Sequence, residues 1–183
     1  MHSPEHYWDT EHFFLGDFEL SMDTNSPGFQ DEIFSNAIPP WEYCSPERLH
    51  GKKPRTACDM WSYMILFTRL WCGIAPFTPY LEGGVMTGIT IYLGRLPYSW
   101  KSDYCWPKTR CDKWYSDADK PMQENDFVPA PASIMKQACP SNDPVMADEA
   151  AVNTAKVFIY ESEKRPSAND LLWDPRLHHI PKK

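Results

Sequence analysis

A run of apolar side chains in residues 57–72 constrains the fold of this chain more than any other feature. Its apolar positions cover almost the whole circumference of a helix with about 3.6 residues per turn; they are Met60, Trp61, Met64, Ile65, Leu66, Phe67, Leu70 and Trp71. A helix that is apolar all round must be surrounded by protein or by lipid. Lipid is excluded because the run is shorter than the roughly 18–20 apolar residues of a membrane span and is interrupted by Asp59 and Arg69. We therefore expect a buried central helix in a mainly α-helical domain.

Local signals set the expected ends of this helix. Thr56 lies where an N-cap is expected, and Asp59 follows three residues later as the acidic member of a capping box. Pro76, shortly after Gly73, prevents the helix from continuing. The pattern predicts a helix that begins just after Thr56 and ends near residue 72.

Charge is distributed unevenly along the 183 residues. Residues 1–47 hold ten acids and no Lys or Arg, whereas residues 48–183 hold fifteen acids and eighteen bases. The net charge of −7 and the lack of a basic stripe interleaved with aromatic residues argue against nucleic acid as a partner. The acidic segment is either simply solvated, or it attracts a basic peptide at long range.

The compartment follows from the N-terminal sequence and the cysteines. Residues 1–10, MHSPEHYWDT, contain neither the basic nor the apolar region of a signal peptide, so we expect a cytoplasmic or nuclear protein with no membrane association. The six cysteines include no C-x-x-C pair. Reduced structural thiols are therefore expected in preference to zinc ligands or disulfides.

Four short motifs resemble, in their order along the chain, the C-terminal lobe of a eukaryotic protein kinase. They are LGDFE at 15–19, SPE at 45–47, DMWS at 59–62 and KRPSA at 164–168. In that family an Asp-Phe-Gly motif holds the metal, Ala-Pro-Glu ends the activation segment, and Asp-x-Trp-Ser-x-Gly opens a buried helix. The resemblance covers about residues 14–177 and is greatest to the SR-protein-kinase-like branch.

The resemblance assigns roles to particular residues. It implies that Glu47 forms a buried bidentate ion pair with Arg165; the alternative is two unrelated surface side chains. Trp61 belongs to the buried helix. Asp59 in the family also grips the backbone of the catalytic loop, but because that loop has no counterpart in this sequence, capping alone is the favoured role.

The position that matches the metal-binding Asp of the family is Asp17. The resemblance implies that Asp17 would hold Mg²⁺ against the phosphates of ATP, as a hard oxygen ligand for a hard cation. Glu19, however, replaces the family's glycine and adds a negative charge beside the phosphates. A metal ligand and a turn-capping Asp both remain open for Asp17.

The expected organisation is a short arm, a lobe and a tail. These are residues 1–13, residues 14–177 and a frayed segment at 178–183, with an activation-segment-like part at 14–47, the central helix at 57–72 and a Pro-rich, insert-like region at 101–144. Further helices are expected at 85–93, 133–138, 147–160 and 167–173, the last with a Ser167–Asp170 capping box. Trp106 and Trp114 in the insert-like region either form a partner surface or pack back on the core.

The sequence also lacks motifs that phosphoryl transfer needs. It contains no G-x-G-x-x-G, no V-A-I-K-like lysine and no H-R-D-like catalytic loop, and sixteen residues precede Asp17, so the N-lobe is expected to be absent. The resemblance implies ATP-dependent Ser/Thr protein phosphorylation with Mg–ATP, and the missing motifs imply an inactive chain. The alternatives are a pseudokinase-like protein-binding or scaffold module, or an incomplete gene product of an active kinase.

Overall fold

The computed structural model describes residues 39–116 and 143–174, together with Gly16, Phe18, Ser21, Asp23 and Lys136. The chain divides into two compact units, Met1–Asp31 and Glu32–Lys183. In the first unit, the backbone N–H of Ser21 donates to the carbonyl of Phe18 at 2.9 Å. The second unit contains the described helices and everything considered below.

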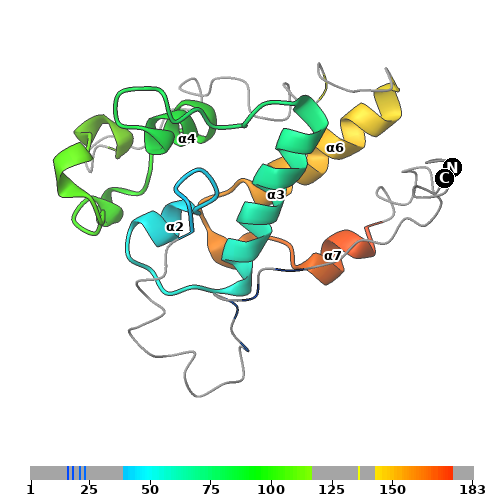
Figure 1. Cartoon of the computed structure of the whole chain (residues 1–183), viewed down its shortest axis with the longest axis horizontal. Coiled ribbons are helices and arrows are strands. Elements are labelled where there is room, and N and C mark those ends of the chain that lie inside the picture. The colour runs from blue at the N-terminus through cyan, green and yellow to red at the C-terminus, as the bar shows by residue number, and fades with distance from the viewer. Residues whose placement is uncertain are drawn as a thin grey trace, which may run out of the picture. The chain divides into compact units, whose positions relative to one another are not determined.

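The described part of this unit is mainly α-helical (Figure 1). Its elements in chain order are α2 (Pro46–Leu49), α3 (Thr56–Cys72), α4 (Val85–Leu93), the 3₁₀ turns η3 (Tyr98–Trp100), η4 (Pro107–Thr109) and η5 (Asp112–Trp114), then α6 (Pro144–Val157), η7 (Ser162–Lys164) and α7 (Ala168–Leu172). A parallel bridge between Leu96 and Tyr115 joins the segment after α4 to the segment after η5.

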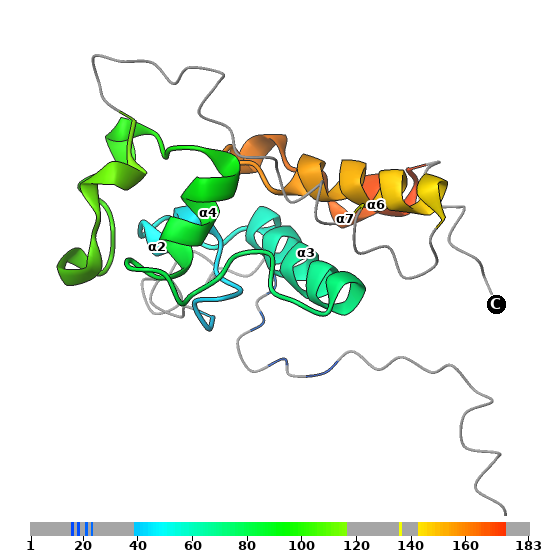
Figure 2. The ribbon, with the colours of Figure 1, turned by 90° about the horizontal axis from the view of Figure 1, so that it is seen from above.

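Helix α3 is the centre of the packing and lies beside α6 in both views (Figures 1 and 2). Trp61 is fully buried on α3, and its ring packs against Phe77 and Phe158 at centroid distances of 5.5 and 4.9 Å. Met64 and Ile65 continue the same buried face one turn further along. Side chains before, within and after the central helix thus share one apolar core.

The expectation that α3 is buried on every side is wrong. Tyr63, Leu66 and Leu70 are exposed, and Leu70 keeps 78% of its surface accessible. The buried side chains on α3 recur with helical spacing, so α6 and the aromatic core cover one face and leave these three residues on the other. The helix is amphipathic in its environment although its sequence is apolar on both faces.

The predicted capping box at the start of α3 is also wrong. Thr56 is the first helical residue, and the N-cap is Arg55, whose backbone is extended and whose side chain makes no capping bond. Asp59 is then the fourth helical residue instead of the third, so its carboxylate lies outside the capping-box position. The predicted C-terminal end is confirmed: Gly73 takes a left-handed φ of 72°, and its N–H donates to the carbonyl of Arg69.

The other helices follow local signals closely. Helix α4 has the predicted bounds, and α7 has the predicted capping box between Ser167 and Asp170. Helix α6 begins earlier than predicted because Asp143 is its N-cap, accepting from the N–H groups of Val145 and Met146, with Pro144 in the first turn. It ends at Val157, before the predicted residue 160.

The aromatic residues at 104–115 in the insert-like region pack back toward the core. Trp114 is 2% exposed, and half-buried Trp106 lies against Trp41 and Tyr104 at centroid distances of 4.7 and 5.9 Å. The predicted helix at 133–138 lies outside the described residues except for Lys136, which is helical. The predicted arm at 1–13 and tail at 178–183 also lie outside them.

None of the helices in the described ranges combines the length and the apolar character needed to cross a lipid bilayer.

Two substitutions on α3 test the one-sided burial. Met64→Ala removes a buried side chain and should lower the free energy of unfolding by about 2–5 kcal/mol. Leu70→Ala shortens an exposed side chain on the opposite face and should change it by no more than about 0.5 kcal/mol. Urea denaturation measures both. Similar losses in the two variants would show that the Leu70 face is covered in solution.

Candidate functional site

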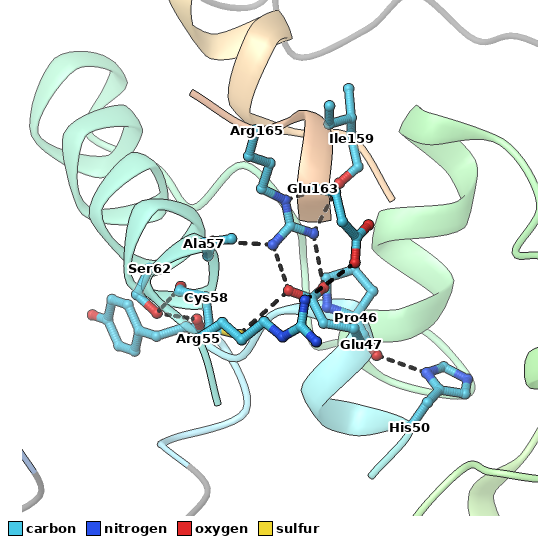
Figure 3. A network of polar contacts seen from close by, with 11 residues as sticks. Pro46, Glu47, His50, Arg55, Ala57, Cys58, Ser62, Ile159, Glu163 and Arg165 are labelled. Atoms are coloured by element: carbon cyan, nitrogen blue, oxygen red, sulfur yellow. Dashed lines mark hydrogen bonds and ion pairs between the residues drawn. The ribbon is translucent and has the colours of Figure 1, made fainter. Parts of the chain in front are cut away.

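Glu47 and Arg165 form a buried ion pair between two segments that lie far apart in the sequence (Figure 3). Glu47 belongs to α2, and Arg165 follows η7 directly. The Nη1 group of Arg165 donates to Oε1 of Glu47 at 2.5 Å, and Nη2 donates to Oε2 at 2.7 Å. The predicted bidentate pair is therefore present, and it closes a loop of more than one hundred residues.

The remaining N–H groups of Arg165 are also satisfied. Nε and Nη2 donate to the carbonyl of Ile159 at 3.0 and 2.8 Å, and Nη1 donates to the carbonyl of Ala57 at 3.1 Å. A guanidinium has five N–H donors, and all five have an acceptor here. The face of the guanidinium lies over the ring of Trp61, 5.0 Å from its centroid. The cation is thus removed from water, but each of its N–H groups keeps a hydrogen-bond acceptor.

Cys58 completes the inner surroundings of Glu47. Its thiol donates to Oε1 of Glu47 at 3.4 Å. Burial raises the pKa of Cys58, and the charge of Glu47 raises it further. Burial also raises the pKa of the neighbouring Cys44 to about 12. Nucleophilic cysteines have lowered pKa values, so the raised pKa of these two free thiols favours a structural role.

A cleft of about 840 Å³ opens beside the ion pair. Glu47 and Cys58 lie on its inner side, and Trp100 and Tyr160 contribute apolar wall. The hydroxyl of Tyr160 donates to the carbonyl of Gly94, and burial raises the pKa of this tyrosine. Trp100 and Tyr160 thus provide an apolar surface for a ligand group beside the buried Glu47.

The rim of the same cleft carries charges of both signs. Arg55 and Glu163 form an exposed ion pair at 3.5 Å, also drawn in Figure 3, and Lys52 binds Asp103 at 2.8 Å. The Lys52 ammonium, which hydrogen-bonds the carboxyl of Asp103, lowers the pKa of that group. Exposed pairs of this kind contribute little to stability, so the rim charges remain available to a ligand.

His50 forms a second buried polar contact close to α2. Its Nδ1 lies 2.7 Å from the carbonyl of Pro46, and its Nε2 lies 2.9 Å from the hydroxyl of Tyr115. A neutral imidazole fits these partners: Nδ1–H donates to the carbonyl, and Nε2 accepts from Tyr115. Burial lowers the pKa of His50 against the opposing effect of the Pro46 hydrogen bond.

Thr56 and Asp59, which were also predicted as site residues, lie in the first turn of α3. Thr56 and Asp59 line a shallow hollow of about 580 Å³ next to Arg165 and Ser167. The carboxylate of Asp59 is largely exposed, and the protein around it raises its pKa. Within the described part of the chain it caps nothing, because the helix begins one residue earlier than predicted.

Asp17, the predicted metal ligand, lies outside the described residues. Among the residues that the structure does describe, no cluster of three or more His, Cys, Asp or Glu side chains is arranged to hold a metal ion. Metal and Mg–ATP binding by Asp17 remains a prediction.

Sequence reasoning missed the His50–Tyr115 contact and the role of Cys58. No periodic pattern links residues 50 and 115, which are 65 positions apart. Cys58 was expected only to be a reduced structural thiol, and nothing in the sequence indicated that its Sγ would donate to the Glu47 carboxylate.

No protein-family model matches this chain, and no curated protein matches it significantly.

The ion pair can be tested by a double-mutant cycle. Glu47→Ala and Arg165→Ala each leave a buried charge unpaired and should each lower the free energy of unfolding by about 3–5 kcal/mol. The double variant should be no more than about 1 kcal/mol worse than the poorer single variant. Urea denaturation provides the measurement, with Glu47→Gln as a milder variant. Removing the exposed Arg55–Glu163 pair, as a matched control, should cost at most about 1 kcal/mol. Additive losses at Glu47 and Arg165 would contradict a shared buried interaction.

The His50 contact predicts a pH dependence of stability. Because the pKa of His50 in the folded state lies below the ordinary value of 6.5, the unfolded chain binds the proton more readily. The stability that neutral His50 provides is therefore present above about pH 6.5 and lost as the pH falls below it. As the pH is lowered below about 6.5, the melting temperature should fall more steeply for the wild-type chain than for the His50→Gln variant. Equal slopes would show that His50 does not titrate with folding.

Proposed function

We propose that this chain is the C-terminal lobe of a protein-kinase-like domain that resembles ATP-dependent Ser/Thr protein kinases. Its role lies in protein phosphorylation, as the lobe that holds the protein substrate in a cytoplasmic or nuclear protein. The acidic residues 1–47 favour a basic peptide as that substrate. In this proposal the 183 residues alone do not transfer phosphate.

The observation that carries the proposal is the meeting of three motifs at one buried point. Glu47 comes from SPE, Trp61 from DMWS and Arg165 from KRPSA. Arg165 forms two hydrogen bonds with Glu47 and stacks its guanidinium over Trp61. Motifs that matched the family by chance would have no reason to contact one another across more than one hundred residues. Their contact supports a common architectural origin.

The proposed lack of transfer follows from the chemistry of phosphoryl transfer. Catalysis there consists almost entirely of positioning and charge stabilisation by a glycine-rich loop, a strand lysine, a catalytic-loop Asp and the metal ligands. Of these, the sequence offers a match only for the metal-binding Asp, at Asp17, followed by Glu19 in place of glycine. A single carboxylate cannot replace the set.

A protein-binding or scaffold function without nucleotide is the second candidate. It is favoured by the cleft beside the Glu47–Arg165 pair, which combines an apolar wall at Trp100 and Tyr160 with charges of both signs on its rim. Such a cleft suits a peptide better than a nucleotide, because no described loop of glycines approaches it to cradle phosphates.

A phosphorylation assay separates the candidates. We expect the purified 183-residue chain, given Mg–ATP and basic Ser-containing peptides, to transfer no phosphate and to show no shift of its melting temperature. Sequencing the transcript then asks whether upstream, in-frame H-R-D and V-A-I-K-like motifs exist, in which case the longer product should phosphorylate the peptides and a Glu47→Gln variant of it should be less active. Transfer by the 183 residues themselves would refute the proposed inactivity. A transcript without those motifs, with no transfer, would favour the scaffold function.

A further inference from the structure

A second, larger cleft lies on the other side of Arg95. It has a volume of about 1380 Å³ and is bounded by α4 with its preceding loop and by the segment that contains η4 and η5. Trp41, Leu81 and Ile91 contribute apolar surface to this cleft, and all three side chains are exposed. We call it the α4 cleft.

The walls of the α4 cleft are held in place by buried contacts. Nε1 of Trp114 donates to Oγ1 of Thr87 at 2.8 Å, which fixes η5 against α4. The N–H of Leu96 donates to the carbonyl of Trp114 at 2.7 Å, and the N–H of Ser116 returns to the carbonyl of Leu96 at 2.9 Å. Gly83 has a φ of +85°, and a Cβ there would lie 2.6 Å from both Trp114 and Thr87. The cleft is therefore formed before any ligand enters.

The charges around the α4 cleft are predominantly positive. Arg95, Lys108, Arg110 and Lys113 line it, against Glu82 and Asp112. Asp112 is already shared between Lys101 at 3.4 Å and Arg110 at 3.6 Å. Arg95, Lys108 and Lys113 are exposed and form no ion pair with any residue in the described part of the chain.

We propose that the α4 cleft binds an acidic peptide segment of a partner protein, with one apolar side chain of the peptide against Leu81 and Ile91. Arg95, Lys108 and Lys113, which form no ion pair within the described residues, supply charge complementarity, and the exposed apolar wall supplies an anchor site. This inference does not rest on the kinase-like assignment, since none of the kinase-like motif residues that the structure describes lines the cleft.

A short peptide fits these observations better than a nucleic acid. The whole chain carries a net charge of −7, which repels a long polyanion, whereas a short acidic segment meets only the local field. The ring of Trp41 packs at 4.7 Å against the ring of Trp106, so only part of its surface is available for base stacking.

Fluorescence anisotropy with the full 183-residue chain tests the proposal. The probe is a fluorescein-labelled peptide of roughly twelve residues that alternates Glu with Leu and has one central Phe. The matched peptide carries Lys in place of every Glu. We expect the acidic peptide to bind, the basic peptide not to bind, and the affinity to fall as salt rises from about 50 to about 200 mM.

Charge reversal locates the binding site. Lys108→Glu with Lys113→Glu should weaken binding of the acidic peptide at least about tenfold, and the neutral pair Lys108→Gln with Lys113→Gln should weaken it less. Both side chains are exposed, so circular dichroism should show an unchanged fold. The control is Lys136→Glu with Lys164→Glu, which changes the net charge equally outside the cleft and should alter the affinity by no more than about twofold.

Three results would overturn the proposal. One is unchanged binding in the Lys108/Lys113 charge reversal. Another is a loss caused instead by Lys52→Glu, which would assign the peptide to the cleft beside Glu47. The third is tighter binding of a single-stranded oligonucleotide than of an acidic peptide of equal charge. Conversely, a shift of the Trp41 indole N–H resonance on adding the acidic peptide would support the proposal. Trp41 lines the α4 cleft and does not line the cleft beside Glu47.

Discussion

The rest of the packing depends on the buried guanidinium of Arg165. Its side chain is fully buried, and an unpaired cation in such a place would cost several kcal/mol. The cost is offset only because a carboxylate and two backbone carbonyls arrive together, from Glu47, Ala57 and Ile159. Those acceptors come from α2, from the first turn of α3 and from the segment after α6, so the charge can be satisfied only when all three are in their native places. The pair therefore specifies the arrangement more than it stabilises it, since a buried ion pair is often no more stable than an apolar replacement.

Local sequence signals predicted the ends of helices well where those ends depend only on residues a few positions away. The bounds of α4, the capping box of α7 and the glycine that ends α3 follow from neighbours within four positions. The start of α3 shows the limit of such signals. A good N-cap is worth only about 1 kcal/mol, which a long-range contact can outweigh. Here Arg165 binds the carbonyl of Ala57 and Cys58 binds Glu47, so tertiary contacts fix the first turn, and Thr56 is taken into the helix.

The faces of α3 could not be predicted, because periodicity says which residues are apolar and not which neighbours cover them. Leu66 and Leu70 are as apolar as Ile65, yet of the three only Ile65 is buried in the described core. In the insert-like region the sequence left two alternatives open for Trp106 and Trp114, a partner surface or packing on the core, and it could not decide between them. In the structure Tyr104, Trp114 and Tyr115 are buried in the core, and Tyr115 forms the bridge to Leu96. The Glu47–Arg165 pair could be predicted despite its separation, because a family resemblance supplied the long-range information that composition and spacing lack.

The two clefts have different relations to this architecture. Glu47 and Cys58 form part of the first cleft, so any ligand there lies against the groups that satisfy Arg165, and a change made to improve binding would also alter the folded state. The α4 cleft contains no member of that network, and its basic side chains lie on a frame held by Trp114, Thr87 and Leu96. Charges at its rim can therefore change at almost no cost in stability. Arg95 borders both clefts, so an acidic ligand at α4 would reduce the positive potential at the first cleft. If both clefts bind, their occupants should interact through this shared charge, and the interaction should weaken with salt because Arg95 is exposed.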